Sequence, residues 1–453
     1  MQIRGMTRIT NILFSHKELL DEKFLQTDLG ILYQAIPFED LASKIPPPKQ
    51  SKSGLGRKPW FDVKGGIALQ FLKHYLRQSD AMLIERINTD WSMQLFCGIA
   101  LKAGERILDT NLPSSWRTYL GKHLNTGELQ EVFARCWKPF MEDTNIGSQD
   151  ATCYESSISY PTDAKLLWQC CQSLYDMMQD ARRRIKLRKS RCNFEAKRIL
   201  FLDYQKRRKK SKRMERKLRK SLLKFLLRLL KQEKELREKY NIALSNTKSK
   251  RLQTIVKIYQ QQHQKAYGSA DLKIEGRIVS LNKPYIRPII RGKEVKPVEF
   301  GAKVNKLQVD GISFIEYLSF DAFNEGVRYK EGIYLQRKLF GKCTHHSADA
   351  IYATNKNRKY ATQQGIQTNF VPKGKQKHEY LEQAKAMRSL LNKERSTVLE
   401  GSFGNEKNHY LLQKVKARNK NTEICWIFFG IMTANSSIIA KRMLLAQSLA
   451  EAA

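Results

Sequence analysis

The chain lacks the marks of a secreted or membrane-spanning protein. Its eight cysteines are scattered and include no Cys-X-X-Cys pair, which favours free thiols in a reducing compartment over a disulfide framework. The first residues, MQIRGMTRITNILFSHKELL, contain no long apolar stretch before a cleavage site of small residues. The apolar run ICWIFFGIMTA, from Ile424, is too short to span a bilayer and indicates a buried core segment. These absences predict a cytoplasmic protein that does not insert into a membrane.

Zinc ligands are also sparse. Cys343, His345 and His346 lie close together, but no second ligand pair has the spacing of a structural zinc site. We therefore expect no zinc centre at this position.

Acidic residues are few relative to basic ones. The chain has 44 Asp and Glu against 82 Lys and Arg, which gives a formal net charge of +38 and a pI of about 9.9. Nucleic acid is the favoured polyanionic partner, because cationic side chains release condensed counterions from phosphates. An anionic membrane surface is the weaker alternative. Since 41% of the 453 residues are apolar, the chain can build cores, and its length suggests about three domains.

The N-terminal part alternates apolar and polar residues at helical spacing. A linker rich in proline, glycine and serine, Ile45–Pro59, interrupts this pattern. Helical periodicity resumes over Trp60–Leu101, where Ser79 and Asp80 offer the N-cap of a second helix. Two helices joined by a short turn are compatible either with a DNA-reading helix-turn-helix or with ordinary bundle packing. The sequence leaves both open.

A strongly basic helical block follows. Residues 164 to about 265 have the pattern of long helices, and the segment Arg182–Lys220 contains 20 basic and three acidic residues. A merely solvated helix would interleave acids, so we expect contacts with a phosphate backbone. Apolar residues from Ser221 onward predict a coiled-coil or helical-hairpin seam. The candidate phosphate contacts in this block are Arg182, Arg183, Arg184, Arg207, Arg208, Lys209 and Lys210.

After Gly268 the pattern becomes strand-like, with short β-rich runs broken by Gly, Pro and Asn. Strands mixed with helices predict an α/β core into which the helical block is inserted after the first strand. The tail is expected to be helical from about Tyr380, with GSFGN at 401–405 as an interruption or a kink. The predicted domains are a helical N-terminal domain at 1–140, a core formed by 141–163 with 268–440, and a basic helical insertion at 164–267.

Three carboxylates stand out by their context. Asp150 is expected to end the first strand, Asp349 ends a second strand, and Glu400 lies in a helical segment. Asp310, in LQVDGISF, also ends a strand and is a rival to Asp349. Carboxylates that converge through folding would bind Mg²⁺, with Mn²⁺ as an alternative ion, and a pair of such ions assists phosphoryl transfer.

The segments around these carboxylates carry a family resemblance. DATCYESSISYPTDAKLLW, from Asp150, resembles the first-aspartate segment of bacterial insertion-sequence transposases of the DDE class. ADAIYATNKNRKYATQQGI, which contains Asp349 and Arg358, is similar to the second segment, and VLEGSFGNEKNHYLL, with Glu400, to the glutamate segment. RGKEVKPVEFGAKV and GRKPWFDVKGGIALQFLKHYLRQSD also look like parts of this family. The resemblance covers roughly residues 20 to 440.

The resemblance implies an RNase H-like mixed sheet with Asp150, Asp349 and Glu400 as a metal-binding catalytic triad. Lys407 matches the lysine of the family's Tyr-Arg-Glu-Lys signature by its spacing from Glu400 and would contact DNA, as would Arg358. Arg395 lies one residue further from the glutamate than that signature asks, and no tyrosine stands three residues before Arg395. The arginine and tyrosine therefore depart from the pattern.

The leading hypothesis is a transposase that cleaves the ends of its own element and joins them to target DNA. The basic helices would hold DNA, the N-terminal helices would read the terminal inverted repeats, and synapsis of two ends would require at least a homodimer. This places the protein on the nucleoid in the bacterial cytoplasm. Two alternatives stay open, namely a noncatalytic DNA- or RNA-binding protein on a transposase-derived fold, and a metal-dependent nuclease without strand transfer.

Overall fold

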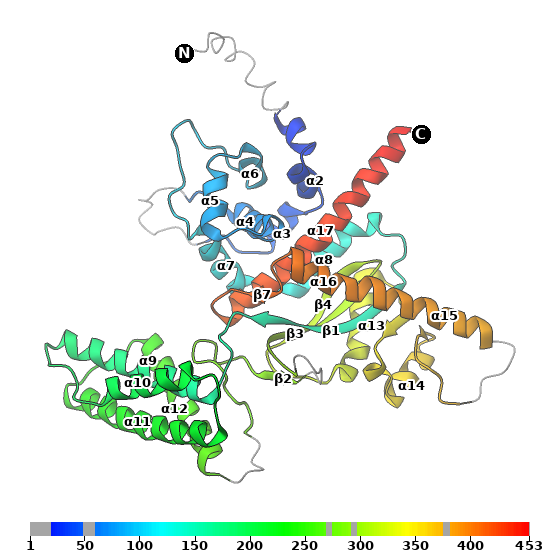
Figure 1. The fold of residues 1–453 in the computed structure, drawn as a ribbon. Helices are drawn as coiled ribbons and strands as arrows, with labels where there is room; N and C mark the ends of the chain where they lie inside the picture. The colour runs from blue at the N-terminus through cyan, green and yellow to red at the C-terminus, as the bar shows by residue number, and fades with distance from the viewer. Residues whose placement is uncertain (1–19, 49–58, 269–273, 291–296, 375–380, 453) are drawn as a thin grey trace. The chain divides into compact units, whose positions relative to one another are not determined.

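The chain is a mixed α/β protein with two compact units. The computed structural model describes residues 20–48, 59–268, 274–290, 297–374 and 381–452, and Figure 1 shows its helices and strands. The first unit takes in residues 1–157, 302–319 and 323–453, and the second takes in 158–301 and 320–322. The predicted α/β class is confirmed. The units differ from the predicted domains, because the N-terminal helices share one unit with the sheet and the insertion is longer than 164–267.

A mixed sheet forms the centre of the first unit. In the part of the chain that the structure describes, neighbouring strands follow the order β3-β1-β5-β6, β4 pairs with β3, and β7 pairs with the last two residues of β1. β1 runs parallel to β5 and β7, and β5 runs parallel to β6. The strands of this unit are β1 Ile146–Ser156, β3 Val298–Val309, β4 Ile312–Ser319, β5 His345–Ala348, β6 Gln367–Thr368 and β7 Lys414–Val415. β1 is buried along most of its length, as a central strand requires.

A tight hairpin joins β3 and β4. Its two turn residues, Asp310 and Gly311, both have positive φ, at 49° and 75°, which is the backbone geometry of a type I′ turn. Asp310 is therefore a turn residue, and its carboxylate is held by Arg442 at 2.6 Å and by the backbone N–H of Glu142. Asp310 thus lies at the hairpin tip, whereas Asp349 directly follows β5, the strand next to β1.

Helices α2 to α8 form a bundle in the same unit. The predicted N-cap at Ser79 is confirmed, because its hydroxyl accepts from the N–H of Met82 at 3.1 Å. The expected single helix after Ser79 is two helices, since Asp90 caps a new start. α4 is buried on nearly all sides, as in a bundle core. The bounds are α2 Asp28–Gln34, α3 Phe38–Ser43, α4 Val63–Leu76, α5 Asp80–Ile87, α6 Trp91–Phe96, α7 Leu112–His123 and α8 Thr126–Trp137.

The long C-terminal helix α17, Lys420–Ala452, joins the bundle to the sheet. It contacts α2, α4, α7 and β4, which explains why the N-terminal helices and the sheet make one unit. Among the helices that the structure describes, this one is long and apolar enough to cross a membrane, but 83% of its most apolar window is buried inside the protein. The expected buried core segment at Ile424 is thus confirmed.

The helical tail is irregular at a different place from the one predicted. GSFGN does not interrupt the helix, because Glu400–His409 is continuous (α16). The irregularity is a π-helical turn, Arg395–Leu399, that follows α15, Leu381–Glu394. The helical tail then breaks at 410–419, where β7 forms. Tertiary contacts of Glu406 and Lys407, described below, hold the glycine-rich helix in place. The remaining helices of this unit are α13 Tyr329–Phe340 and α14 Asn355–Gln363.

The second unit is built from four helices that pack on one another (Figure 1). They are α9 Asp163–Arg184, α10 Phe194–Lys206, α11 Lys212–Lys239 and α12 Asn246–Tyr267. The expected long helices and the apolar seam are confirmed, since Leu222, Leu226 and Leu229 of α11 are fully buried in the core cluster. At the start of α9, buried Asp163 accepts hydrogen bonds from Lys265 at 2.5 Å and Arg277 at 2.9 Å. A short strand, β2 Pro288–Ile290, pairs with Val298–Phe300.

All eight cysteines are free, and six are buried, in agreement with the prediction of reduced thiols. Cys343 lies in the core, with its sulfur 3.9 Å from Nδ1 of His346. Burial lowers the pKa of His346 to about 3, so its ring is neutral at physiological pH, and Nε2 faces the Gln149 side chain at 3.2 Å.

Candidate catalytic site

Asp150 and Asp349 lie on neighbouring parallel strands. Asp150 is inside β1, not at the end of the strand as expected, because β1 continues to Ser156. β5 ends at Ala348, which is opposite Gln149. Because parallel strands keep their register, the next residue on each chain, Asp150 and Asp349, stand beside one another where β5 ends. Each carboxylate accepts the N–H of its following residue at 2.7 Å.

Arg395 forms ion pairs with both Glu400 and Asp150. One guanidinium nitrogen of Arg395 lies 3.1 Å from a carboxylate oxygen of Asp150 and 3.1 Å from one of Glu400. The two acids come from β1 and α16, 250 residues apart in sequence, and their side chains are 15% and 51% exposed. The structure therefore brings all three predicted carboxylates to one region, with an arginine between two of them.

The π-helical turn explains why Arg395 reaches Glu400 despite its spacing. A π-helix closes hydrogen bonds between residues five apart, one more than in an α-helix. Arg395 and Glu400 are five apart and bound this turn, and the backbone N–H of Glu400 bonds to the carbonyl of Arg395. The sequence has one more residue between the arginine and the glutamate than the family signature. The π-helical turn accommodates this residue, so that Arg395 still lies next to Glu400. No helical periodicity in the sequence signals this.

The three carboxylates supply oxygen atoms of the kind that bind a hard cation, but this structure does not gather them into a metal site. Among the residues that the structure describes, no three His, Cys, Asp or Glu side chains are close enough together to hold a metal ion. Oxygen donors of this kind fit Mg²⁺ chemically. The guanidinium of Arg395 lies between Asp150 and Glu400 in this structure. The position between these two acids therefore attracts positive charge.

The pKa of Asp150 is raised to about 6, mainly because burial disfavours the charged form. The N–H of Ala151 and the charge of Arg395 oppose this shift, while the negative charges of Glu325 and Asp349 add to it. Glu325, at the start of a short 3-10 helix, was not predicted as a site residue. It forms an ion pair with Lys303 at 2.7 Å, and its negative charge contributes to the raised pKa of Asp150.

A buried polar network holds α16 against the sheet. Lys306 of β3 donates to Glu406 at 2.6 Å, and both side chains are almost fully buried. The hydroxyl of Tyr154, on β1, also donates to Glu406, and burial lowers the pKa of Lys306 against the opposing effect of Glu406. This network was not predicted from the sequence, although one signal was present. Lys306 is a lone charge in the buried strand segment 304–309.

Lys407 lies next to this network on the same helix as Glu400. Its ammonium group donates to the hydroxyl of Thr152, two residues after Asp150, at 2.8 Å. Glu400 and Lys407 are two helical turns apart, so both face the side of β1 that carries Asp150. The predicted DNA contact by Lys407 stays a prediction, and its position beside the carboxylates supports it.

Arg358 has a different environment from that expected. Its guanidinium donates to the carbonyls of Ala353 and Val371, at 3.0 and 2.5 Å, and lies over the ring of Phe370. These contacts hold the segment after Asp349 in place. A role of Arg358 in DNA binding remains untested.

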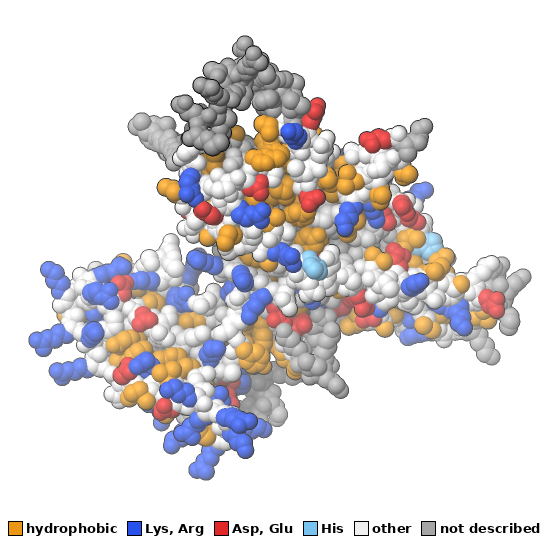
Figure 2. All heavy atoms as spheres, turned by 45° about the horizontal axis from the view of Figure 1, so that its top comes forward, with side chains coloured by type: hydrophobic (Ala, Val, Ile, Leu, Met, Phe, Trp, Pro, Cys, Tyr) orange, Lys and Arg blue, Asp and Glu red, His pale blue; other side chains and the backbone are white. Residues whose placement is uncertain are grey.

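The basic residues of the second unit fall into two groups. Arg182 and Arg184 are already engaged, by the carbonyl of Arg188 at 2.6 Å and by Asp180 at 3.2 Å. Arg183, Arg207, Arg208, Lys209 and Lys210 are exposed. Figure 2 shows Lys and Arg side chains projecting from the surface of the molecule with few acids between them. Arg184 is exposed as well but is paired with Asp180, so the five exposed residues that form no ion pair with any described residue are the better candidates for phosphate contacts.

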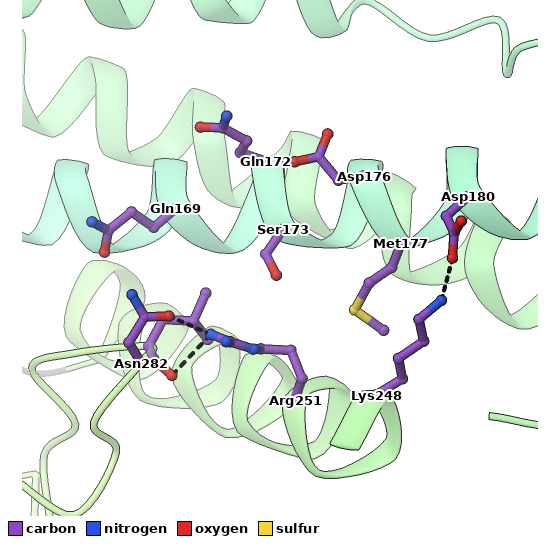
Figure 3. Close-up of a pocket in the computed structure, with 10 residues that line it drawn as sticks. Gln169, Gln172, Ser173, Asp176, Met177, Asp180, Lys248, Arg251 and Asn282 are labelled. Atoms are coloured by element: carbon purple, nitrogen blue, oxygen red, sulfur yellow. Dashed lines mark hydrogen bonds and ion pairs between the residues drawn. The ribbon is translucent and has the colours of Figure 1, made fainter. Parts of the chain in front are cut away.

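A pocket of about 440 Å³ lies in the second unit (Figure 3). It contains two basic and two acidic side chains; Lys248 pairs with Asp180, and Arg251 donates to the neutral amide of Asn282 at 2.8 Å. Burial raises the pKa of Asp176, a further acid in its wall. The pocket has neither the three carboxylates nor an excess of positive charge, so it is not the site that the sequence predicted.

No protein-family model matches the chain, and comparisons with curated proteins and with solved structures also find no match.

Proposed function

We propose that the protein is a DDE transposase that cleaves DNA at the ends of an insertion element and transfers the strands into target DNA. The observation that carries the proposal is the convergence of Asp150, Asp349 and Glu400, from three distant segments, at the place where β5 ends. Convergence of this kind is not expected of an arbitrary trio among 44 acidic residues.

The sheet supports an RNase H-like core. A central strand, β1, has the antiparallel β3–β4 pair on one side and the parallel strands β5 and β6 on the other. Helices α13 and α15 contact β1 and β5, and α17 contacts β4. This arrangement is compatible with the fold that the family resemblance implies, and the helical unit is inserted directly after β1.

Each residue of the site has a role in this proposal. Asp150, Asp349 and Glu400 would hold divalent ions, which would supply Lewis-acid activation to the phosphoryl transfer. Lys407 would bind a phosphate of the DNA end, since a lysine supplies a point charge. Lys306, Glu406 and Tyr154 would be positioning residues that fix α16, and through it Glu400, against β1.

A cleavage assay tests the proposal. Purified protein is mixed with labelled DNA that carries the ends of its element, in Mg²⁺ or in EDTA, beside Asp150→Ala, Asp349→Ala and Glu400→Ala. We expect metal-dependent cuts at the ends that all three variants lose while their DNA affinity is retained. Asp310→Ala is the matched control, because this acid lies at the hairpin tip and should leave cutting intact. Full cleavage by Asp150→Ala would remove the triad from consideration.

One observation favours a second candidate, a noncatalytic nucleic-acid-binding protein. Arg395 already forms an ion pair with both Asp150 and Glu400, as an arginine with a structural role would. In that case the protein would bind DNA with strong salt dependence but would cut it in no metal, and the three alanine variants would change stability alone. A nuclease without strand transfer would show the same cuts but no joined products.

A further inference from the structure

A basic hollow of about 620 Å³ lies in the first unit beside the candidate catalytic site. Its walls come from α4 and α5, α7, the end of α16 and the segment that contains β7 and the start of α17. Lys407 is part of its lining. The volume is in the range of small-ligand sites, about 300–1,000 Å³, which suits one sugar-phosphate strand rather than a whole duplex.

The charges that line the hollow are unbalanced. One carboxylate lines it, that of Asp80, and this acid is already paired with Lys73 at 2.7 Å and Arg117 at 3.1 Å. Lys73 and Arg117 are buried, and Arg117 packs over the Trp426 ring at 4.7 Å. This inner cluster is therefore a structural floor whose acid is not available to other cations.

The outer charges have no such partner. Arg77, Lys414, Lys416 and Arg418 line the same hollow and form no ion pair with any residue that the structure describes. Burial lowers the pKa of Lys73, the pairing with Asp80 opposes this, and the positive charges of Arg117 and Lys416 lower it further. Like charges gathered in a hollow repel one another, so an anion bound there is favoured.

Two rigid elements connect the hollow to the carboxylates. Lys407 is seven residues after Glu400 on α16, which is about 10 Å along a helix. On the other side, Lys414 and Val415 pair with Glu155 and Ser156 at the end of β1, the strand that carries Asp150. An anion in the hollow is thus held a short way from the predicted point of cleavage.

We propose that this hollow binds the phosphates of a DNA strand within a few nucleotides of the cleaved bond, through Arg77, Lys407, Lys414, Lys416 and Arg418. The assignment of this strand rests on the proposed function. Gln78, in the same wall, has a buried side-chain oxygen with no hydrogen-bond partner among the described residues, and this oxygen could accept from an amino group of a base.

Binding of DNA in EDTA tests the site apart from catalysis. Fluorescein-labelled single-stranded DNA and duplex DNA of mixed sequence are titrated with the full chain by anisotropy at several salt concentrations. For Lys414→Ala/Lys416→Ala/Arg418→Ala we expect at least tenfold weaker binding and a slope of log K against log salt that is smaller by about 2–3. The matched control, Lys138→Ala/Lys342→Ala/Lys441→Ala, removes the same charge from exposed positions outside the hollow. It should leave the affinity nearly unchanged and should change the slope by no more than about one.

Equal losses in the two triple variants would overturn the proposal, because the effect would then be one of net charge. Lys416→Gln/Arg418→Gln, which spares the β7 residues, repeats the comparison if the first variant folds poorly. The triple variant at positions 414, 416 and 418 could instead lose binding of polyglutamate while its binding of DNA stays unchanged. That result would assign the hollow to an acidic protein and would also overturn the proposal. If the wild type fails to cut its element ends in Mg²⁺ but the triple variant loses DNA affinity, the catalytic function falls and the binding site stands.

Discussion

The guanidinium of Arg395 lies 3.1 Å from the carboxylate of Asp150, and the π-helical turn that begins at Arg395 places Glu400 beside the same guanidinium. The same nitrogen also reaches Glu400. An arginine in this position competes directly with any divalent cation for two of the three predicted metal ligands. The contact is therefore a testable link between the local helix geometry and metal affinity.

Replacement of Arg395 should strengthen metal binding in the absence of DNA. Arg395→Gln removes the competing charge, so we expect three- to tenfold tighter binding of Mn²⁺, which is about 0.7–1.4 kcal/mol. The measurement is titration of Mn²⁺ by electron paramagnetic resonance. Arg388→Gln is the matched control, since this residue is on α15, before the π-helical turn. Unchanged or weaker Mn²⁺ binding by Arg395→Gln would show that the arginine does not block the site.

Asp150 should make metal binding depend on pH. Its pKa of about 6 lies above the ordinary value of 3.8, so the folded protein favours the protonated form. A metal ion requires the carboxylate, and Mn²⁺ affinity should therefore fall as pH drops below about 6. We expect the fall to approach tenfold per pH unit if one proton is displaced, measured by the same titration between pH 5 and 8.

The raised pKa of Asp150 also affects stability. Metal affinity should rise with pH, whereas the free energy of unfolding should fall. Because the folded state binds the proton more tightly, ionisation of Asp150 lowers the unfolding free energy as pH rises from about 4 to 6. Asp150→Asn should thus gain stability relative to the wild type over this range, by at most about 1.4 kcal/mol per pH unit, and the difference should be constant above pH 7. Urea unfolding at several pH values measures it. A difference that does not change with pH would contradict the raised pKa.

Lys306 and Glu406 should behave as a coupled buried pair. Lys306→Met leaves the charge of Glu406 buried without its partner, and we expect a loss of about 3–5 kcal/mol in unfolding free energy. The double variant Lys306→Met/Glu406→Leu should recover much of this, because neither charge is then buried. Chemical unfolding of the two single variants and the double variant completes the cycle. Additive losses would mean that the two side chains do not depend on one another.

The same cycle separates stability from positioning. If α16 is held by this pair, cleavage by the double variant should remain impaired after its stability is recovered, because the anchor of the helix that carries Glu400 is gone. A double variant that is both stable and fully active would show that the other contacts of α16, among them the bond from Lys407 to Thr152, suffice to position Glu400.

Several features of the fold were predictable from local pattern. The N-cap at Ser79, the long helices of the insertion and the buried segment at Ile424 depend on residue type and spacing over a few turns, and each was confirmed. Asp310-Gly311 carried a hairpin signal of the same local kind, which the sequence analysis read as a strand end. Asp310 lies in this turn and is paired with Arg442.

Other features depend on contacts between segments that are far apart. The sequence suggested an N-terminal domain separate from the core, but α17 buries against helices and a strand more than a hundred residues away and joins them in one unit. GSFGN was expected to break the helix because glycine is a poor helix former. The buried contacts of Glu406 with Lys306 and Tyr154 override that local preference.

The sequence by itself determined the excess of positive charge and the α/β class, since these follow from composition and from short-range periodicity. The three acidic residues were chosen because the segments that carry them resemble those of a transposase family. Only the tertiary structure decided that Asp150 and Asp349 stand side by side, that Arg395 lies between Asp150 and Glu400, and that a basic hollow adjoins them. The physical reason is that strand register, a π-helical turn and the pairing of buried charges are fixed by packing across the whole unit. No local pattern specifies which distant partner each of these side chains will meet.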